Sequence, residues 1–224
     1  MKKTTITVVV LAIVIILAIV LFGSKSTTNT SNVANNTETS TQSVPVSETV
    51  KVSGKLTEYK NSELGFAVQY PSSWSKGESA SGVNFVVPID KDTVTTMAKL
   101  EVDISTFSGK CAFPPVTTVK ERKTVTLGDK SFSMITLANT VQNRSYFNRM
   151  YSYQRDNVCY IFAFSSISFA PASKGLSGSN VVQAENNNKA LINTTDQAFT
   201  EMVKSFTFVK TEDGKDEASV GTKK

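Results

Sequence analysis

The chain has 224 residues, 40% of them hydrophobic, with a net charge of +5, two cysteines and no histidine. This length and hydrophobic content are sufficient for one domain with a hydrophobic core. The lack of histidine excludes Ser-His-Asp and Cys-His nucleophilic arrangements and histidine-based metal sites. The basic residues are scattered along the chain, so we predict no nucleic-acid partner. No cofactor or metal motif is present, and we predict neither.

An uncharged segment near the N-terminus predicts attachment to a membrane. It runs from Thr4 to Ser24, after Lys2 and Lys3, and consists mainly of Ile, Val, Leu and Ala. A helix of about 20 residues reaches about 30 Å, which is enough to cross the hydrocarbon core of a bilayer. We therefore predict a transmembrane helix at residues 5–23, with the lipid bilayer as its partner.

A cleaved signal peptide is the alternative, because lysines before an apolar stretch are typical of both. This stretch is longer than the apolar region of most signal peptides, and it ends in Val20-Leu21-Phe22-Gly23. A cleavage site requires small side chains there, so the sequence favours a retained anchor. The positive-inside rule then places residues 1–4 in the cytoplasm and the C-terminal domain outside the cell membrane.

Polar segments flank the domain that we expect at residues 55–210. Ser, Thr and Asn dominate residues 24–54, and residues 211–224 are polar and charged. Segments of this composition bury too little apolar surface to offset the entropy of ordering their backbone. We predict that both are disordered, and that 24–54 is a linker that tethers the domain to the membrane.

Alternating apolar and polar residues predict strands in the first half of the domain. Phe66, Val68 and Tyr70 alternate with small or polar residues and run into Pro71, and a second strand is expected from Val83 to Val87. Such alternation is typical of antiparallel sheets that bury one face.

Two hairpins are expected further along the chain. Residues 125–136 surround a turn at Gly128-Asp129-Lys130, and residues 151–164 surround a turn at 155–157. The second hairpin carries aromatic residues at every other position. Such rows can stack on sugars or bases, but cross-strand core pairs are commoner, and we assign them to the core.

The last part of the domain is expected to hold a loop and one helix. Residues 170–193 contain glycines, a proline and the triplet Asn186-Asn187-Asn188, which predict a long loop or an insertion. A capping box predicts that a helix begins at Thr194. A closing strand should follow, so the chain has an α+β fold with an antiparallel sheet.

The two cysteines, Cys111 and Cys159, are most simply a structural disulfide in an extracytoplasmic domain. A redox couple and a metal site are the alternatives. The sequence has no Cys-x-x-Cys spacing and no histidine, which disfavours both.

Two sets of residues resemble catalytic groups. Ser73 and Lys76 satisfy a Ser-x-x-Lys pattern, but they follow a proline in a turn instead of opening a helix. Glu101 and Asp103 occupy successive outward positions of a strand expected from Leu100, where charges usually serve solubility. We predict that both carboxylates face solvent and that the protein has no catalytic residue.

Two segments at the ends of the domain carry a family resemblance. Tyr59–Trp74 reads YKNSELGFAVQYPSSW, and Phe199–Phe208 reads FTEMVKSFTF. They resemble the frame of PsbP-like domains, which small membrane-anchored bacterial ectodomains of unknown function share. The resemblance implies an antiparallel β-sheet flanked by helices, an α/β/α sandwich, with Phe66 and Tyr70 inward and Trp74 capping the core. No functional residue of the photosynthetic members is matched, so their role in photosystem II assembly does not transfer.

These observations predict a non-enzymatic, single-pass membrane protein. Its extracytoplasmic domain would be a binding or assembly module of the cell envelope, and its partner an unknown envelope protein. A structural, pilin-like envelope subunit is one alternative, and the missing leader motif argues against it. A hydrolase without histidine, using Ser73 and Lys76 or Glu101 and Asp103, is the other.

Overall fold

The computed structural model describes residues 55–113, 116 and 119–209. The predicted transmembrane helix at 5–23, the linker at 24–54 and the tail at 211–224 lie outside the described residues. Within the described ranges, no helix has both the length and the apolar character of a membrane span.

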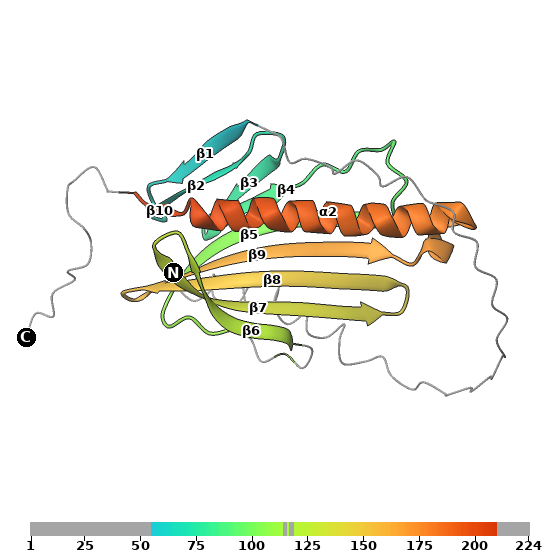
Figure 1. Cartoon of the computed structure of the whole chain (residues 1–224). Helices are drawn as coiled ribbons and strands as arrows, with labels where there is room; N and C mark the ends of the chain where they lie inside the picture. The colour runs from blue at the N-terminus through green and yellow to red at the C-terminus, as the bar shows by residue number, and fades with distance from the viewer. Residues whose placement is uncertain (1–54, 114–115, 117–118, 210–224) are drawn as a thin grey trace, which may run out of the picture. The chain divides into compact units, whose positions relative to one another are not determined.

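The described chain forms two antiparallel sheets and one long helix (Figure 1). The smaller sheet has the strand order β1-β2-β10, and the larger has the order β3-β4-β5-β9-β8-β7-β6. The strands are β1 (Leu56–Asn61), β2 (Phe66–Pro71), β3 (Ser75–Ser79), β4 (Gly82–Val86), β5 (Met97–Ser108), β6 (Val119–Leu127), β7 (Lys130–Val141), β8 (Arg144–Arg155), β9 (Val158–Phe169) and β10 (Thr207–Phe208). The 3-10 helix η1 (Pro171–Lys174) and helix α2 (Ser179–Lys204) follow β9. The predicted α+β class with antiparallel strands is confirmed.

Two-residue turns join the long strands of the larger sheet. β6 and β7 meet at Gly128-Asp129, and β8 and β9 meet at Asp156-Asn157, which confirms both predicted hairpins. The first residue of each turn has a positive φ, 63° and 52° respectively, as two-residue hairpin loops require. The turn at 142–143 between β7 and β8 was not expected. Its first residue is a glutamine with φ 54°, a conformation in which asparagine, aspartate and glycine are commoner.

The expectation of a loop or insertion at residues 170–193, with a helix beginning at Thr194, is wrong. After η1, α2 begins at Ser179, so Thr194 lies inside the helix. The residues that α2 buries recur at helical spacing along its length, as an amphipathic helix requires. They are Ala184, Thr195, Phe199, Met202 and Val203.

Asparagine side chains hold the first half of α2 against the segment before β5. The Asn187 amide donates to the carbonyl oxygen of Val94 at 2.8 Å. Asn188 accepts from the backbone N–H of Thr96 at 3.2 Å and from the Thr95 hydroxyl, and it donates to the Thr96 hydroxyl at 2.7 Å. Asparagine weakly disfavours helices because it bonds competing backbone groups. Here those bonds are tertiary, which explains why an asparagine-rich segment is helical.

The core lies between α2, β2 and the larger sheet. The ring of Phe206 is 5.0 Å from that of Phe162 and 6.1 Å from that of Phe66. The ring of Phe199 is 5.4 Å from that of Tyr151. All five side chains are buried, so the assignment of the aromatic rows to the core is confirmed.

Both segments of the PsbP-like frame meet in the smaller sheet. Phe208 in β10 pairs with Phe66 in β2, and the Tyr70 ring lies 4.6 Å from that of Phe85. Phe66, Tyr70 and Trp74 are buried, as the resemblance implies. In the part of the chain that the structure describes, α2 is the single α-helix, so a sandwich with helices on both faces is not seen there.

Candidate functional site

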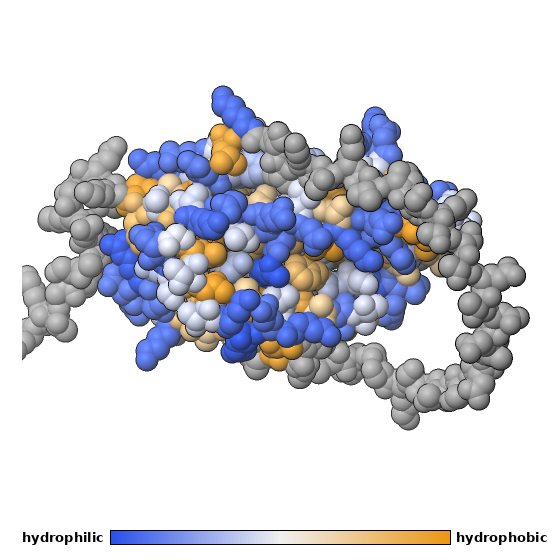
Figure 2. All heavy atoms as spheres, in the orientation of Figure 1, coloured by the Kyte–Doolittle hydropathy of each residue, from blue (hydrophilic) through white to orange (hydrophobic). Residues whose placement is uncertain are grey.

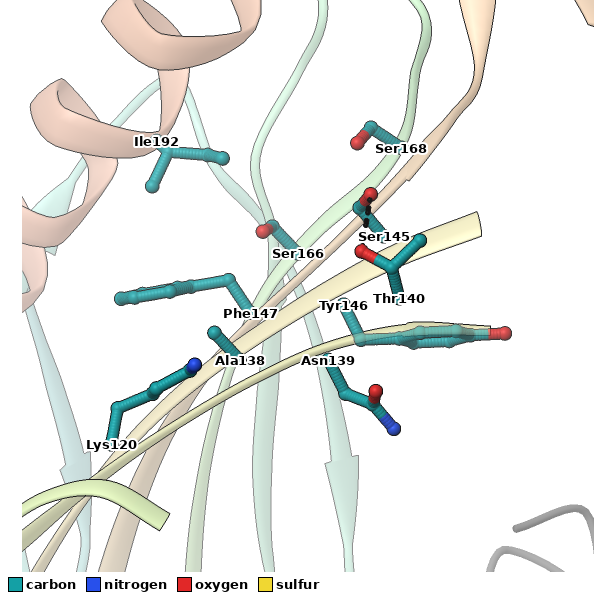
Figure 3. A pocket seen from close by; sticks show the side chains of 10 residues that line it. All are labelled: Lys120, Ala138, Asn139, Thr140, Ser145, Tyr146, Phe147, Ser166, Ser168 and Ile192. Atoms are coloured by element: carbon teal, nitrogen blue, oxygen red, sulfur yellow. Dashed lines mark hydrogen bonds between the residues drawn. The ribbon is translucent and has the colours of Figure 1, made fainter. Parts of the chain in front are cut away.

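A hollow of about 440 Å³ opens between α2 and one end of the larger sheet (Figure 3). Its floor follows from the strand register. Side chains of paired residues lie on the same face of a sheet, and two rows of paired residues cross β7, β8 and β9 beneath the hollow. The rows are Ala138, Phe147 and Ser166, and then Thr140, Ser145 and Ser168.

The floor offers four hydroxyl groups, and the described residues leave two of them without a hydrogen bond. Ser166 is 3% exposed as a residue, but its hydroxyl oxygen opens to the hollow and makes no hydrogen bond with any described residue. The Ser168 hydroxyl makes none either. Thr140 and Ser145 share one hydrogen bond of 3.2 Å. A hydroxyl both donates and accepts, so these groups retain capacity to bind a ligand.

Lys120 supplies the charge at the rim of the hollow. The register between β6 and β7 shifts between Val119 and Glu121, which makes Lys120 the extra residue of a β-bulge. Bulges re-aim side chains at sheet edges. Figure 3 shows the Lys120 side chain extending toward Ala138. Among the described residues the Lys120 ammonium has no carboxylate partner.

An ion pair lies beside the apolar part of the lining, which Phe147 in the floor and Ile192 on α2 form. Arg149 follows Phe147 on the same face of β8 and binds Asp196, one helical turn after Ile192. The Arg149 guanidinium also lies 5.7 Å from the centre of the Phe147 ring. Burial raises the pKa of Asp196, although Arg149 opposes this. One Asp196 oxygen, Oδ1, is buried without a partner in the described structure. The pair joins α2 to the sheet beside the hollow and sets a guanidinium next to the Phe147 ring.

The structure places the predicted Ser-x-x-Lys residues away from the hollow. Ser73 is exposed in the turn before β3, and Lys76 is exposed in β3, an edge strand. The Lys76 ammonium pairs with Glu78 and lies 5.2 Å from the centre of the Tyr59 ring. Its interactions are those of a surface residue, and neither Ser73 nor Lys76 lines the hollow.

Glu101 and Asp103 differ from the expectation that they simply face solvent. Both project from the face of β5 opposite the core, but they are partly buried. The Asn84 amide on the neighbouring strand lies 2.8 Å from Asp103 Oδ1 and 3.4 Å from Glu101 Oε2. Burial raises the pKa of Asp103, and the Asn84 hydrogen bond opposes that rise. Lys99 pairs with Glu101. The cluster is a cross-strand network on a sheet surface.

Cys111 and Cys159 are bonded to each other, with their Cα atoms 5.1 Å apart. The bond connects the segment after β5 to the start of β9. Gln154 braces the same segment, since its amide donates to the carbonyl oxygen of Gly109 at 3.1 Å and accepts from the N–H of Cys111 at 2.6 Å. In the described ranges no group of three or more His, Cys, Asp or Glu side chains is arranged to hold a metal ion.

Sequence reasoning did not identify the residues of the hollow. A signal was present in β9, where Phe162 and Phe164 are followed at the same spacing by Ser166 and Ser168. The buried face therefore changes from aromatic to hydroxyl-bearing at one end. Lys120 had no such signal, because its orientation depends on a bulge.

Three solved structures resemble the chain in outline, at low sequence identity. A Bacteroides thetaiotaomicron protein has a TM-score of 0.43 and 15% identity over 70% of this chain, which spans about half (49%) of that protein. The Ran-binding protein Mog1p of Saccharomyces cerevisiae has a TM-score of 0.40 and 11% identity over 71% of this chain and 98% of its own. LpqN of Mycobacterium tuberculosis, which is involved in cell envelope biogenesis, has a TM-score of 0.37 and 11% identity over 70% of this chain and 91% of its own. No protein-family model and no curated protein matches the chain. Likenesses of this size assign no function.

Proposed function

We propose that the protein is a non-enzymatic binding or assembly module of the cell envelope. In this proposal a PsbP-like domain is held outside the cell membrane by one N-terminal helix and a linker, and the hollow is its ligand-binding surface. The observation that carries the proposal is the row of hydroxyls at the floor of the hollow, of which those of Ser166 and Ser168 make no hydrogen bond with a described residue, beside a lysine without a carboxylate partner. Ligand-binding sites are typically concave, with a small number of polar groups that converge on the ligand.

The same groups favour binding over catalysis. A nucleophilic serine needs a base within hydrogen-bonding reach. Lys120 makes no hydrogen bond to Ser145, Ser166 or Ser168 in the described structure, and no carboxylate lines the hollow. The hydrolase alternative based on Ser73 and Lys76 gains no support, because Lys76 pairs with a glutamate.

The binding surface is tested by filling the hollow in the intact chain. Ser145 is an exposed residue of its floor, so Ser145→Trp adds bulk there without entering the core. Ser133→Trp is the matched control, because Ser133 is exposed on the opposite face of the same sheet, in β7. Native membranes carrying each chain are cross-linked, and the products bound to the chain are identified.

We expect one envelope component to be captured by the unmodified chain and by Ser133→Trp, and to be lost with Ser145→Trp. Equal capture by all three chains would show that the component contacts another surface. Absence of any capture by a folded, membrane-bound chain would contradict a binding role.

The proposed location has a separate test. A membrane-impermeant amine reagent is added to intact cells, and the labelled lysines are mapped by mass spectrometry. Exposed domain lysines such as Lys91 should be labelled, whereas Lys2 and Lys3 should react only after lysis. Labelling of the domain only after lysis would place it in the cytoplasm and refute the orientation.

A further inference from the structure

We infer that the ligand of the hollow is an acidic saccharide, a sugar chain whose rings carry carboxylate groups. This rests on the proposed function, because it names the ligand class of the same hollow. Three features of the lining lead to it: hydroxyls without partners, an apolar wall beside them, and a single cation.

The hydroxyls on the floor match a partner that donates and accepts at neighbouring positions. Ser166 is buried and makes no hydrogen bond with the described residues, and Ser168 lies two residues further along the same face of β9. The Ser166 hydroxyl oxygen is open to the hollow, so it keeps its capacity to donate and accept. Sugar hydroxyls, spaced along a ring, both donate and accept, and so they can satisfy several such groups at once.

The wall beside these hydroxyls is apolar. Phe147 lies in the floor, and Ile192 faces it from α2 (Figure 3). A sugar ring presents hydroxyls around its edge and C–H groups on its faces, so it can bond to the serines while packing on Phe147. Ligand sites commonly combine apolar walls with a few polar groups that fix orientation. The ion pair of Arg149 with Asp196 joins β8 to α2 beside Phe147.

The charge of the lining selects an acidic sugar. Lys120 is its one charged residue, and it has no carboxylate partner among the described residues. A carboxylate on the ligand would give it a charge-assisted hydrogen bond. No Asp or Glu lines the hollow to repel that carboxylate.

Other ligand classes fit less well. A peptide that adds a strand needs a free sheet edge, but the floor strands β7, β8 and β9 are paired on both sides, and the free edge on this side of the sheet is that of β6. An amphipathic helix needs an apolar groove, whereas four of the floor residues bear hydroxyls. The face that carries α2 is mainly hydrophilic, with apolar groups in small separate patches (Figure 2). Large apolar patches, which mark many protein-docking surfaces, are not seen on that face.

The test uses the intact chain in nanodiscs of zwitterionic lipid and measures binding by calorimetry. The probes are a trimer of galacturonate, the same trimer as its methyl ester, and a short polyaspartate. The ester keeps the hydroxyls that are free in the acid but removes the charge, and polyaspartate keeps the charge but lacks the sugar rings. The variants are Lys120→Gln, Ser166→Ala, and the pair Ser145→Trp and Ser133→Trp.

We expect the trimer to bind, and its ester to bind more weakly by about twofold to fivefold, as for an exposed ion pair. Lys120→Gln should abolish that difference. Ser166→Ala should weaken both by about twofold to tenfold, the range for one hydrogen bond. Ser145→Trp should remove binding and Ser133→Trp should not.

Three outcomes would overturn the inference. Binding of polyaspartate as tight as that of the trimer would mean that charge alone is recognised. Binding of the trimer that survives Ser145→Trp would place it elsewhere. If no saccharide binds while the cross-linked component is still lost with Ser145→Trp, the ligand class is wrong and the proposed function stands.

Discussion

The attachment of α2 to the segment before β5 gives a sharp prediction, because one side chain makes three of the bonds. Asn188 bonds the Thr95 hydroxyl and both the N–H and the hydroxyl of Thr96. Thr96 is fully buried, so Asn188→Ala would leave two of its polar groups without these partners and without water.

The expected loss of stability follows from those two groups. Leaving a buried donor or acceptor unsatisfied costs about 1–3 kcal/mol. Alanine favours a helix more than asparagine does, by about 0.5 kcal/mol, which offsets part of this loss. For two such groups we therefore expect Asn188→Ala to lower the free energy of unfolding by about 1.5–5.5 kcal/mol. Asn186→Ala is the control, since Asn186 is exposed on the same helix and its side chain makes no hydrogen bond to a described residue.

The assay is urea unfolding of the intact chain in detergent, followed by circular dichroism. Asn186→Ala should unfold within about 0.5 kcal/mol of the unmodified chain, as is usual for surface changes. If Asn188→Ala is no less stable than Asn186→Ala, the asparagine bonds do not hold α2 in place. The explanation for the helical conformation of its asparagine-rich first half then fails.

Three more variants test the fold. Burial raises the pKa of Asp103, so the folded state binds its proton more tightly than the unfolded chain, and stability is lost as pH rises through the folded pKa. The stability of Asp103→Asn relative to the unmodified chain, measured by urea titration, should therefore rise from pH 3 to pH 7. A stability difference that does not vary with pH would contradict the raised pKa. Replacing Cys111 and Cys159 with serine, which opens a loop with a sequence separation of 48, should cost about 4 kcal/mol, and a cost below about 1 kcal/mol would refute a structural role. Gly82→Ala should lower the melting temperature because the added Cβ would lie 2.1 Å from a backbone oxygen of β5, whereas Gly77→Ala meets nothing within 4 Å; equal melting temperatures would count against the β4–β5 packing.

Local patterns in the sequence predicted much of the sheet, because alternation and turn residues are local signals. The strand at Phe66 and the turn at Gly128 are examples. The first half of α2 escaped prediction because its helix depends on contacts distant in the chain, such as that of Asn188 with Thr96. Asparagine-rich segments suggest loops when those contacts are unknown.

The hollow was hidden for a similar reason. Ser145 and Ser168 are ordinary strand residues until the register sets them side by side in one row. The strand with Glu101 and Asp103 was predicted, but the bonds of Asn84 to both carboxylates required knowing that β4 lies next to β5. Pairing between distant strands, unlike alternation within one strand, leaves little trace in a single sequence.

The central claim is that the hollow contacts a ligand in the cell envelope, and site-specific photo-cross-linking tests it most directly. A photoreactive phenylalanine analogue replaces Thr140 at the hollow in one chain and Ser131 on the same strand but outside the hollow in another; both positions are exposed. After irradiation of living cells, we predict a covalent adduct with an envelope component from position 140 and not from position 131. Adducts from both positions alike, or from neither in a folded chain, would contradict the account.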